Sequence, residues 1–163
     1  MILAVTILCV LVAILAFVIL PDRTPRLDRE ILQSSRALWN EKGPADYDLS
    51  ILIQVDRQDE ARAGVVVRNG KLTSQSYNGL ERKGRDDSYT IEGLLETMER
   101  ELDLARGEGE EGSTILKAEF DQQRGFPIVF KKLTTRQGSR SYVIRLAELR
   151  SESSGILFPG KHP

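Results

Sequence analysis

The sequence is short of the residues that carry most side-chain chemistry. It has one cysteine, Cys9, and one histidine, His162, among 163 residues. A single cysteine cannot form a disulfide within the chain or a thiolate metal site, and a single histidine close to the end of the chain gives no histidine metal site. The same single histidine argues against a serine–histidine or cysteine–histidine catalytic triad. We therefore predict no catalytic, cofactor-binding or metal-ligating residues and no cofactor.

An excess of positive charge is also missing. The 23 Lys and Arg are balanced by 24 Asp and Glu, which gives a formal net charge of −1, and no run of Lys and Arg exceeds two residues. Binding to nucleic acid needs a cationic surface that displaces counterions. We therefore predict no nucleic-acid partner. The glycine cluster at 107–112, GEGEEG, is acidic and would repel phosphate, so it indicates a solvated loop.

What the sequence does contain is a long apolar run at its start. Nineteen of the first 20 residues are apolar, and only Thr6 interrupts them. A helix of this length rises about 30 Å, the thickness of the hydrocarbon core of a bilayer. A signal peptide would have a basic residue before the apolar run and a small-x-small cleavage site, and both are missing here. The bulky Leu8 before Cys9 argues against a lipoprotein. We expect a transmembrane helix at residues 1–20 that contacts the membrane.

The direction of this anchor is open. Arg23, Arg26 and Arg29 follow the apolar run, and no basic side chain precedes it. Under the positive-inside rule these arginines favour a domain in the cytoplasm. The family resemblance described below favours the opposite side of the membrane.

After the apolar run, two segments have helical patterns. The Thr24-Pro25 pair is typical of a helix start and the Gly43-Pro44 pair of a helix end, so we predict a helix over 25–42. A second helix is predicted from Ile91 to Ala105, capped by Thr90. Its expected apolar stripe consists of Ile91, Leu94, Leu95, Met98 and Leu102.

Other segments alternate with the period of a strand. The first predicted strand is Tyr47 to Val55, and Asn69-Gly70 predicts a type I′ hairpin turn. The remaining predicted strands are Arg62 to Arg68, Lys71 to Tyr77, 114–121, Phe126 to Leu133 and Arg140 to Arg150. The polar third strand, Lys71 to Tyr77, is expected at an edge or facing water, and residues 78–88 are expected to form a charged loop.

These patterns predict an α+β fold with a transmembrane helix first. The soluble part would run helix, three strands, helix, three strands, and its short turns require an antiparallel sheet. The expected divisions are an anchor at 1–20, a soluble domain at 21–150 and a flexible tail at 151–163. Trp39, close to the end of the first helix, is expected to pack in the core or at a hinge.

Three groups of carboxylates are the remaining candidates for chemistry. They are Asp56, Asp59 and Glu60; Asp86 and Asp87; and Glu108, Glu110 and Glu111. None fits the calcium loop of an EF-hand, and each is typical of a solvated turn. A pair of carboxylates brought together by the fold stays open as an alternative, in an enzyme or a small-ligand or cation-binding domain.

Several motifs occur in the order found in one known family. They are Trp39, Tyr47-Asp48-Leu49, Val67-Arg68-Asn69-Gly70-Lys71-Leu72, Thr90-Ile91-Glu92-Gly93-Leu94-Leu95, and Phe120-Asp121 before Gly125-Phe126-Pro127-Ile128. Over about residues 36–149 the chain resembles a family of small bacterial cell-envelope domains of unknown function, secreted or lipoprotein-like. Relatives often have a cysteine pair in or after the first strand, and Ile51–Val55 has none, so no thiol role is carried over.

The resemblance implies an envelope location and brings no catalytic residues. Together with the missing catalytic groups, it leads us to predict a single-pass membrane protein of undetermined role whose domain lies outside the cytoplasm. The domain would be a non-catalytic protein-interaction or structural module, with another envelope protein as its partner.

Overall fold

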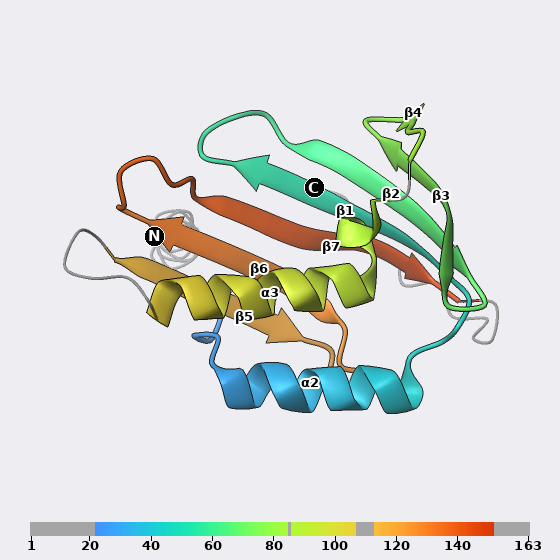
Figure 1. Cartoon of the computed structure of the whole chain (residues 1–163), viewed down its shortest axis with the longest axis horizontal. Helices are drawn as coiled ribbons and strands as arrows, with labels where there is room; N and C mark the ends of the chain where they lie inside the picture. The colour runs from blue at the N-terminus through green and yellow to red at the C-terminus, as the bar shows by residue number, and fades with distance from the viewer. Residues whose placement is uncertain (1–21, 85, 107–112, 152–163) are drawn as a thin grey trace, which may run out of the picture.

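The computed structural model describes residues 22–84, 86–106 and 113–151. These residues form two α-helices, α2 (Arg29–Lys42) and α3 (Ile91–Arg106), and a short 3-10 turn, η1 (Asp87–Tyr89), that leads into α3 (Figure 1). The strands are β1 (Tyr47–Val55), β2 (Ala61–Arg68), β3 (Lys71–Tyr77), β4 (Leu80–Glu81), β5 (Thr114–Phe120), β6 (Pro127–Thr134) and β7 (Tyr142–Arg150).

All of these strands belong to one antiparallel sheet with the order β4-β3-β2-β1-β7-β6-β5. The strand β1 lies at its centre, where Ile51 stands opposite Ala63 of β2 on one side and Leu146 of β7 on the other. The strands before α3 and the strands after it therefore meet along β1 and β7 and form one continuous sheet.

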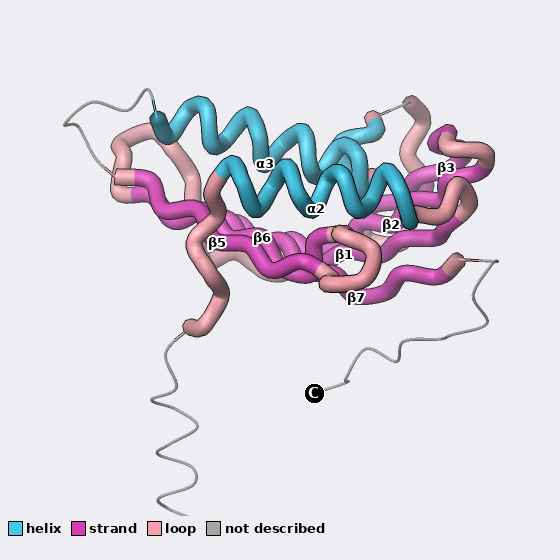
Figure 2. Tube along the Cα trace, turned by 90° about the horizontal axis from the view of Figure 1, so that it is seen from below, coloured by secondary structure: helices cyan, strands magenta, loops and turns pink. Residues whose placement is uncertain are grey.

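Both helices cover the same face of the sheet (Figure 2). The core lies between the two helices and the sheet. Alternate residues of β1 point into it, and Tyr47, Leu49 and Ile51 are at most 3% exposed. The predicted apolar stripe of α3 is confirmed, since Ile91, Leu94, Leu95, Met98 and Leu102 are all buried. Burial of this apolar area, worth about 25 cal/mol per Å², is the main force that holds the helices to the sheet. We call the opposite face, which carries Ser50, Lys117 and Lys131, the open face.

The turn between β2 and β3 has the predicted geometry. Asn69 and Gly70 have φ angles of 51° and 66°, the left-handed values that a type I′ turn needs at both central positions. Asn78 and Gly79 have φ angles of 50° and 78° and form a second turn of the same kind. This second turn produces β4 inside the segment that the sequence predicts as a loop, so that prediction is wrong for Leu80–Glu81.

The first described helix starts later than predicted. The expected helix spans 25–42, but α2 begins at Arg29, and the side chain of Asp28 caps it by accepting a hydrogen bond from the Ile31 N–H. The reason is that the backbone before Asp28 pairs with β5: the Leu27 N–H donates to the Leu116 carbonyl at 2.9 Å, and the Ala118 N–H donates to the Pro25 carbonyl at 3.1 Å.

The predicted fold class needs correction. The described residues form a sheet-rich domain of seven antiparallel strands and two helices, not two sets of three strands behind a transmembrane helix. Neither α2, with 14 residues, nor α3, with 16, is long or apolar enough to cross a bilayer, which takes about 20 apolar residues. The predicted single-pass membrane location, with the domain outside the cytoplasm, is therefore not supported by the described residues.

Two predictions concern residues that the structure does not describe. The transmembrane helix at 1–20 lies outside the described residues, as does the tail at 151–163 apart from Ser151. The boundaries of the soluble domain, 21–150, remain a prediction.

Candidate functional site

The outer side of β3 is only partly covered. The two-residue strand β4 pairs with Ser76 and Tyr77, and the next residue, Arg82, donates its N–H to the Gln75 carbonyl at 3.0 Å. Along Lys71–Ser74, no strand in the described part of the chain lies on this side. A strand edge of this kind presents backbone N–H and C=O groups that another strand can pair with. The prediction that the third strand lies at an edge is therefore correct for Lys71–Ser74 only.

The local sequence explains why β4 is so short. The Asn78-Gly79 turn reverses the chain directly after β3, and β4 begins at Leu80. At Gly84, φ is 135°, which the backbone of other residues rarely adopts, and the chain leaves the sheet there. The side chain of Gln75 fixes the departing segment by donating to the Gly84 carbonyl at 3.1 Å.

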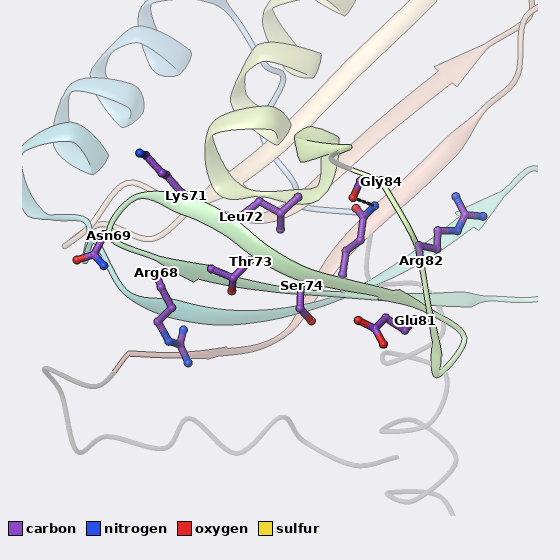
Figure 3. Close-up of a pocket in the computed structure, with 10 residues that line it drawn as sticks. Arg68, Asn69, Lys71, Leu72, Thr73, Ser74, Glu81, Arg82 and Gly84 are labelled. Carbon is purple, nitrogen blue, oxygen red and sulfur yellow. Dashed lines mark hydrogen bonds between the residues drawn. The ribbon is translucent and has the colours of Figure 1, made fainter.

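A groove of about 750 Å³ opens along this uncovered stretch (Figure 3). It is lined by both ends of the β2–β3 hairpin turn, by β3 and by the segment that leaves β4. The lining residues are Arg68, Asn69, Lys71, Leu72, Thr73, Ser74, Gln75, Glu81, Arg82 and Gly84. We call it the β3 groove.

The charges of the β3 groove are mostly positive. Lys71 and Arg82 lie at its opposite ends (Figure 3), and neither forms a salt bridge with a described carboxylate. The Arg82 guanidinium lies over the Tyr77 ring, 4.7 Å from its centroid. Arg68 is different, because it pairs with Asp48 at 2.8 Å. Glu81 is the one acidic residue of the lining.

Arg82 also acts on a neighbouring carboxyl group. The pKa of Asp86 is lowered chiefly by hydrogen bonds from the Ser88 hydroxyl and N–H, and to a smaller degree by the charge of Arg82. Asp86 thus stays ionised as the cap of η1, near enough to Arg82 to feel its charge, although these two described residues form no salt bridge.

A second hollow, of about 390 Å³, adjoins the β3 groove and shares Lys71 and Leu72 with it. Its far wall is the start of α3, where Glu92 accepts hydrogen bonds from Trp39 Nε1 at 2.8 Å and from the Tyr47 hydroxyl at 2.7 Å. Burial, followed by the effect of the Glu92 carboxylate, raises the pKa of Tyr47. Trp39 is only 3% exposed, so it packs in the core, one of the two places predicted for it. The wall is therefore fixed from both the helix and the sheet.

The carboxylate groups named from the sequence have separate structural tasks. Asp56 accepts a hydrogen bond from the Ser141 N–H at 3.0 Å, Glu60 pairs with Arg145 at 3.3 Å, and Asp86 caps η1. Glu108, Glu110 and Glu111 lie outside the described residues. Within 22–84, 86–106 and 113–151, no three His, Cys, Asp or Glu side chains gather in a group that could hold a metal ion.

Sequence reasoning missed one ionic cluster on the helix-covered face. Glu101, which is 8% exposed, pairs with Lys132 at 2.7 Å and accepts a hydrogen bond from the Tyr142 hydroxyl at 3.2 Å. Burial and the charge of Glu101 raise the pKa of Tyr142. A signal for this cluster exists in the sequence, because Lys132 continues the inward-facing series of β6 two residues after Phe130.

No protein-family model, curated protein or solved structure matches this chain. The resemblance to small envelope domains therefore stays a prediction. A functional proposal has to rest on the geometry of the described residues, and the β3 groove combines a hollow of about 750 Å³ with a stretch of strand that has no neighbour.

Proposed function

We propose that this chain is a non-catalytic protein-interaction domain that binds an extended segment of a partner protein beside β3. The observation that carries the proposal is the uncovered stretch Lys71–Ser74 with the β3 groove of about 750 Å³ along it. A partner segment would become the next strand of the sheet at this position.

The mode of binding follows from the chemistry of a sheet edge. In strand addition, backbone hydrogen bonds supply affinity, and hollows for alternate side chains supply specificity. The β3 groove offers both, because side chains directed to the helix-covered face would reach the adjoining hollow beside Leu72, and the others would pass Thr73 and Ser74. Since β3 already pairs with β2 along its inner side, the partner would dock on a formed strand.

Peptide selection with NMR mapping tests the proposal. Random peptides about nine residues long, within the usual length of a strand, would be selected for binding to the chain. The bound peptides are expected to shift the amide resonances of Lys71–Gln75 and to slow hydrogen exchange there. Selected peptides that bind elsewhere and leave β3 unchanged would contradict the proposal.

A matched control separates backbone pairing from side-chain contact. The best peptide would be made in two further versions, N-methylated at alternate residues in one register or the other. Strand addition requires that one version lose binding while the other keeps most of it, because only alternate N–H groups of an added strand face β3. Equal binding by both versions would speak against strand addition.

The alternative, a catalytic, small-ligand or cation site made of carboxylates, has no specific observation in its favour among the described residues. Asp56, Glu60 and Asp86 serve a turn, an ion pair and a cap. Asp87 lines the second hollow with Glu92, but the Glu92 carboxylate is already hydrogen-bonded to Trp39 and Tyr47.

A further inference from the structure

We infer that the segment bound in the β3 groove is acidic and carries two carboxylates about four residues apart, one for Lys71 and one for Arg82. This inference rests on the proposed function of the β3 edge and names the chemistry of its partner. Both cations line the groove and lie at its two ends (Figure 3).

The spacing comes from the register of the sheet. Arg82 stands beside Gln75, to whose carbonyl it donates its N–H at 3.0 Å. Lys71 precedes Gln75 by four residues. A strand rises about 3.3 Å per residue, and the register of β3 shifts between Leu72 and Ser74, so the backbone positions of the two cations are at most about 13 Å apart along β3. An added strand would lie beside Lys71–Ser74 and end where Arg82 takes the position next to Gln75. One carboxylate would then meet Lys71, and a second, about four residues further along the bound segment, would meet Arg82.

Of the three basic residues in the lining, Lys71 and Arg82 are chosen because neither forms a salt bridge with a described carboxylate. Arg68 already has a carboxylate partner in Asp48. Lys71 and Arg82 form no salt bridge among the described residues, although Arg82 stacks on Tyr77 and its charge acts on Asp86 at longer range. Their charges are therefore available to a ligand without the loss of an existing salt bridge.

The same charges also disfavour the wrong partners. A lysine on a sheet edge discourages pairing with neutral or basic strands, which is a common protection against aggregation. An acidic strand would turn this penalty into attraction, and discrimination of this kind combines attraction to one partner with repulsion of others. The groove therefore suits an acidic segment better than an apolar one.

Designed peptides test the inference. The probe is a labelled peptide of alternating threonine and valine with two glutamates four residues apart, measured by fluorescence anisotropy. It is compared with a version whose glutamates are two residues apart and with a version that has glutamines instead. We expect the four-residue spacing to bind about tenfold more tightly than the glutamine version at low salt, and the advantage to fall as salt screens the pairs.

Charge-reversal variants locate the contacts. The acidic peptide should bind more tightly than the glutamine peptide, and Lys71→Glu and Arg82→Glu are each expected to remove roughly half of this difference in binding free energy. The reason is that exposed ion pairs contribute similar small amounts. Arg57→Glu makes the same change of charge in the exposed β1–β2 turn, away from the groove, and should leave binding unchanged. The double variant should instead prefer a peptide with two lysines, a rescue that an unfolded protein could not show.

The outcomes separate this inference from the proposed function. If the glutamine peptide binds as well as the acidic one and still protects the β3 amides, strand addition stands and the acidic partner is overturned. If no peptide of the panel protects those amides, the proposed function fails with it. If a single-stranded oligonucleotide displaces the acidic peptide and binds more tightly, the groove is a nucleic-acid site and the inference is overturned.

Discussion

The two edges of the sheet are finished in opposite ways. Along β5, the segment 22–27, which we call the strap, lies beside the strand. The backbone of its Arg26 forms an isolated antiparallel β-bridge with the backbone of Lys117. Figure 2 shows this segment passing β5 toward the open face. At the other edge, β4 covers only Ser76 and Tyr77 of β3. The strap thus pairs with β5 at Leu116–Ala118, in the middle of that strand, whereas at the other edge Lys71–Ser74 has no neighbouring strand among the described residues.

The charges at the two edges differ in the same way. On the open face, Lys117 stands directly opposite Lys131, and Asp22 of the strap pairs with both, at 3.1 and 2.7 Å. Like charges at directly opposed positions destabilise a sheet unless something compensates them. Lys71 and Arg82, the cations of the β3 groove, form no such salt bridge with a carboxylate of the described residues. The comparison teaches what a filled edge looks like in this fold: backbone pairing together with a carboxylate that neutralises the basic side chains.

The largest effect is expected from truncating the strap at its buried residue. Leu27 is 3% exposed, and Leu27→Ala should lower the free energy of unfolding by about 3 kcal/mol, because buried leucines leave a cavity when shortened. Urea denaturation would measure the change. The matched control is Leu80→Ala in β4, where the side chain is 75% exposed and the expected change is within about 0.5 kcal/mol. Equal losses at the two positions would show that the edges do not differ as described.

The sequence predicted the paired part of the sheet better than its edges. Alternation along Tyr47–Val55 located β1, and Asn69-Gly70 located the hairpin before β3, since both signals are local. The strap could not be found in this way, because Thr24-Pro25 is a good helix start and only contact with the distant β5 overrides it. β4 could have been found, since Asn78-Gly79 repeats the hairpin signal.

The candidate site was less predictable than the strands. The polar pattern of Lys71–Tyr77 indicated an edge or a water-facing strand, but not which stretch of it stays uncovered. That depends on the order of the strands and on where the chain leaves the sheet near Gly84, and neither is encoded in a single segment. The side-chain patterns that identify a catalytic site do not apply to a surface made of backbone groups.

A second prediction compares a buried glutamate on the helix-covered face, Glu101, with an exposed one in the lining of the β3 groove, Glu81. Lys132 of β6 pairs with Glu101, and the two side chains are only 12% and 11% exposed. Glu101→Gln should lower the free energy of unfolding by about 2 kcal/mol, because it leaves a largely buried ammonium group without its counter-charge. The same change at Glu81, in the lining of the β3 groove, should alter stability by less than about 0.5 kcal/mol. Thermal unfolding of both variants at neutral pH distinguishes them, and an unchanged Glu101→Gln variant would contradict the role given to the pair.

The smallest expected effect concerns the carboxylate of the strap. Hydrogen bonds, first from Lys131 and then from Thr24, hold the pKa of Asp22 well below its usual range. Because the folded-state pKa is depressed, Asp22 stabilises the fold fully at neutral pH, and this contribution decreases as the pH falls below the ordinary aspartate pKa of about 3.9. The side chain is 38% exposed, so Asp22→Asn should cost only about 0.5 kcal/mol at pH 7.

Two measurements test this last effect against a control. The difference in unfolding free energy between the natural chain and Asp22→Asn should shrink progressively as the pH falls below about 4, whereas Asp59→Asn, in an exposed turn, should show no difference at pH 7. Hydrogen exchange should be faster at the Ala118 amide, which donates to the strap, because the loss of Asp22 loosens the segment that covers β5. An unaltered Ala118 amide would mean that the backbone bonds of Pro25 and Leu27 hold the strap by themselves. The salt bridges would then compensate the two lysines without closing the edge, and the filled edge would need only its backbone pairing.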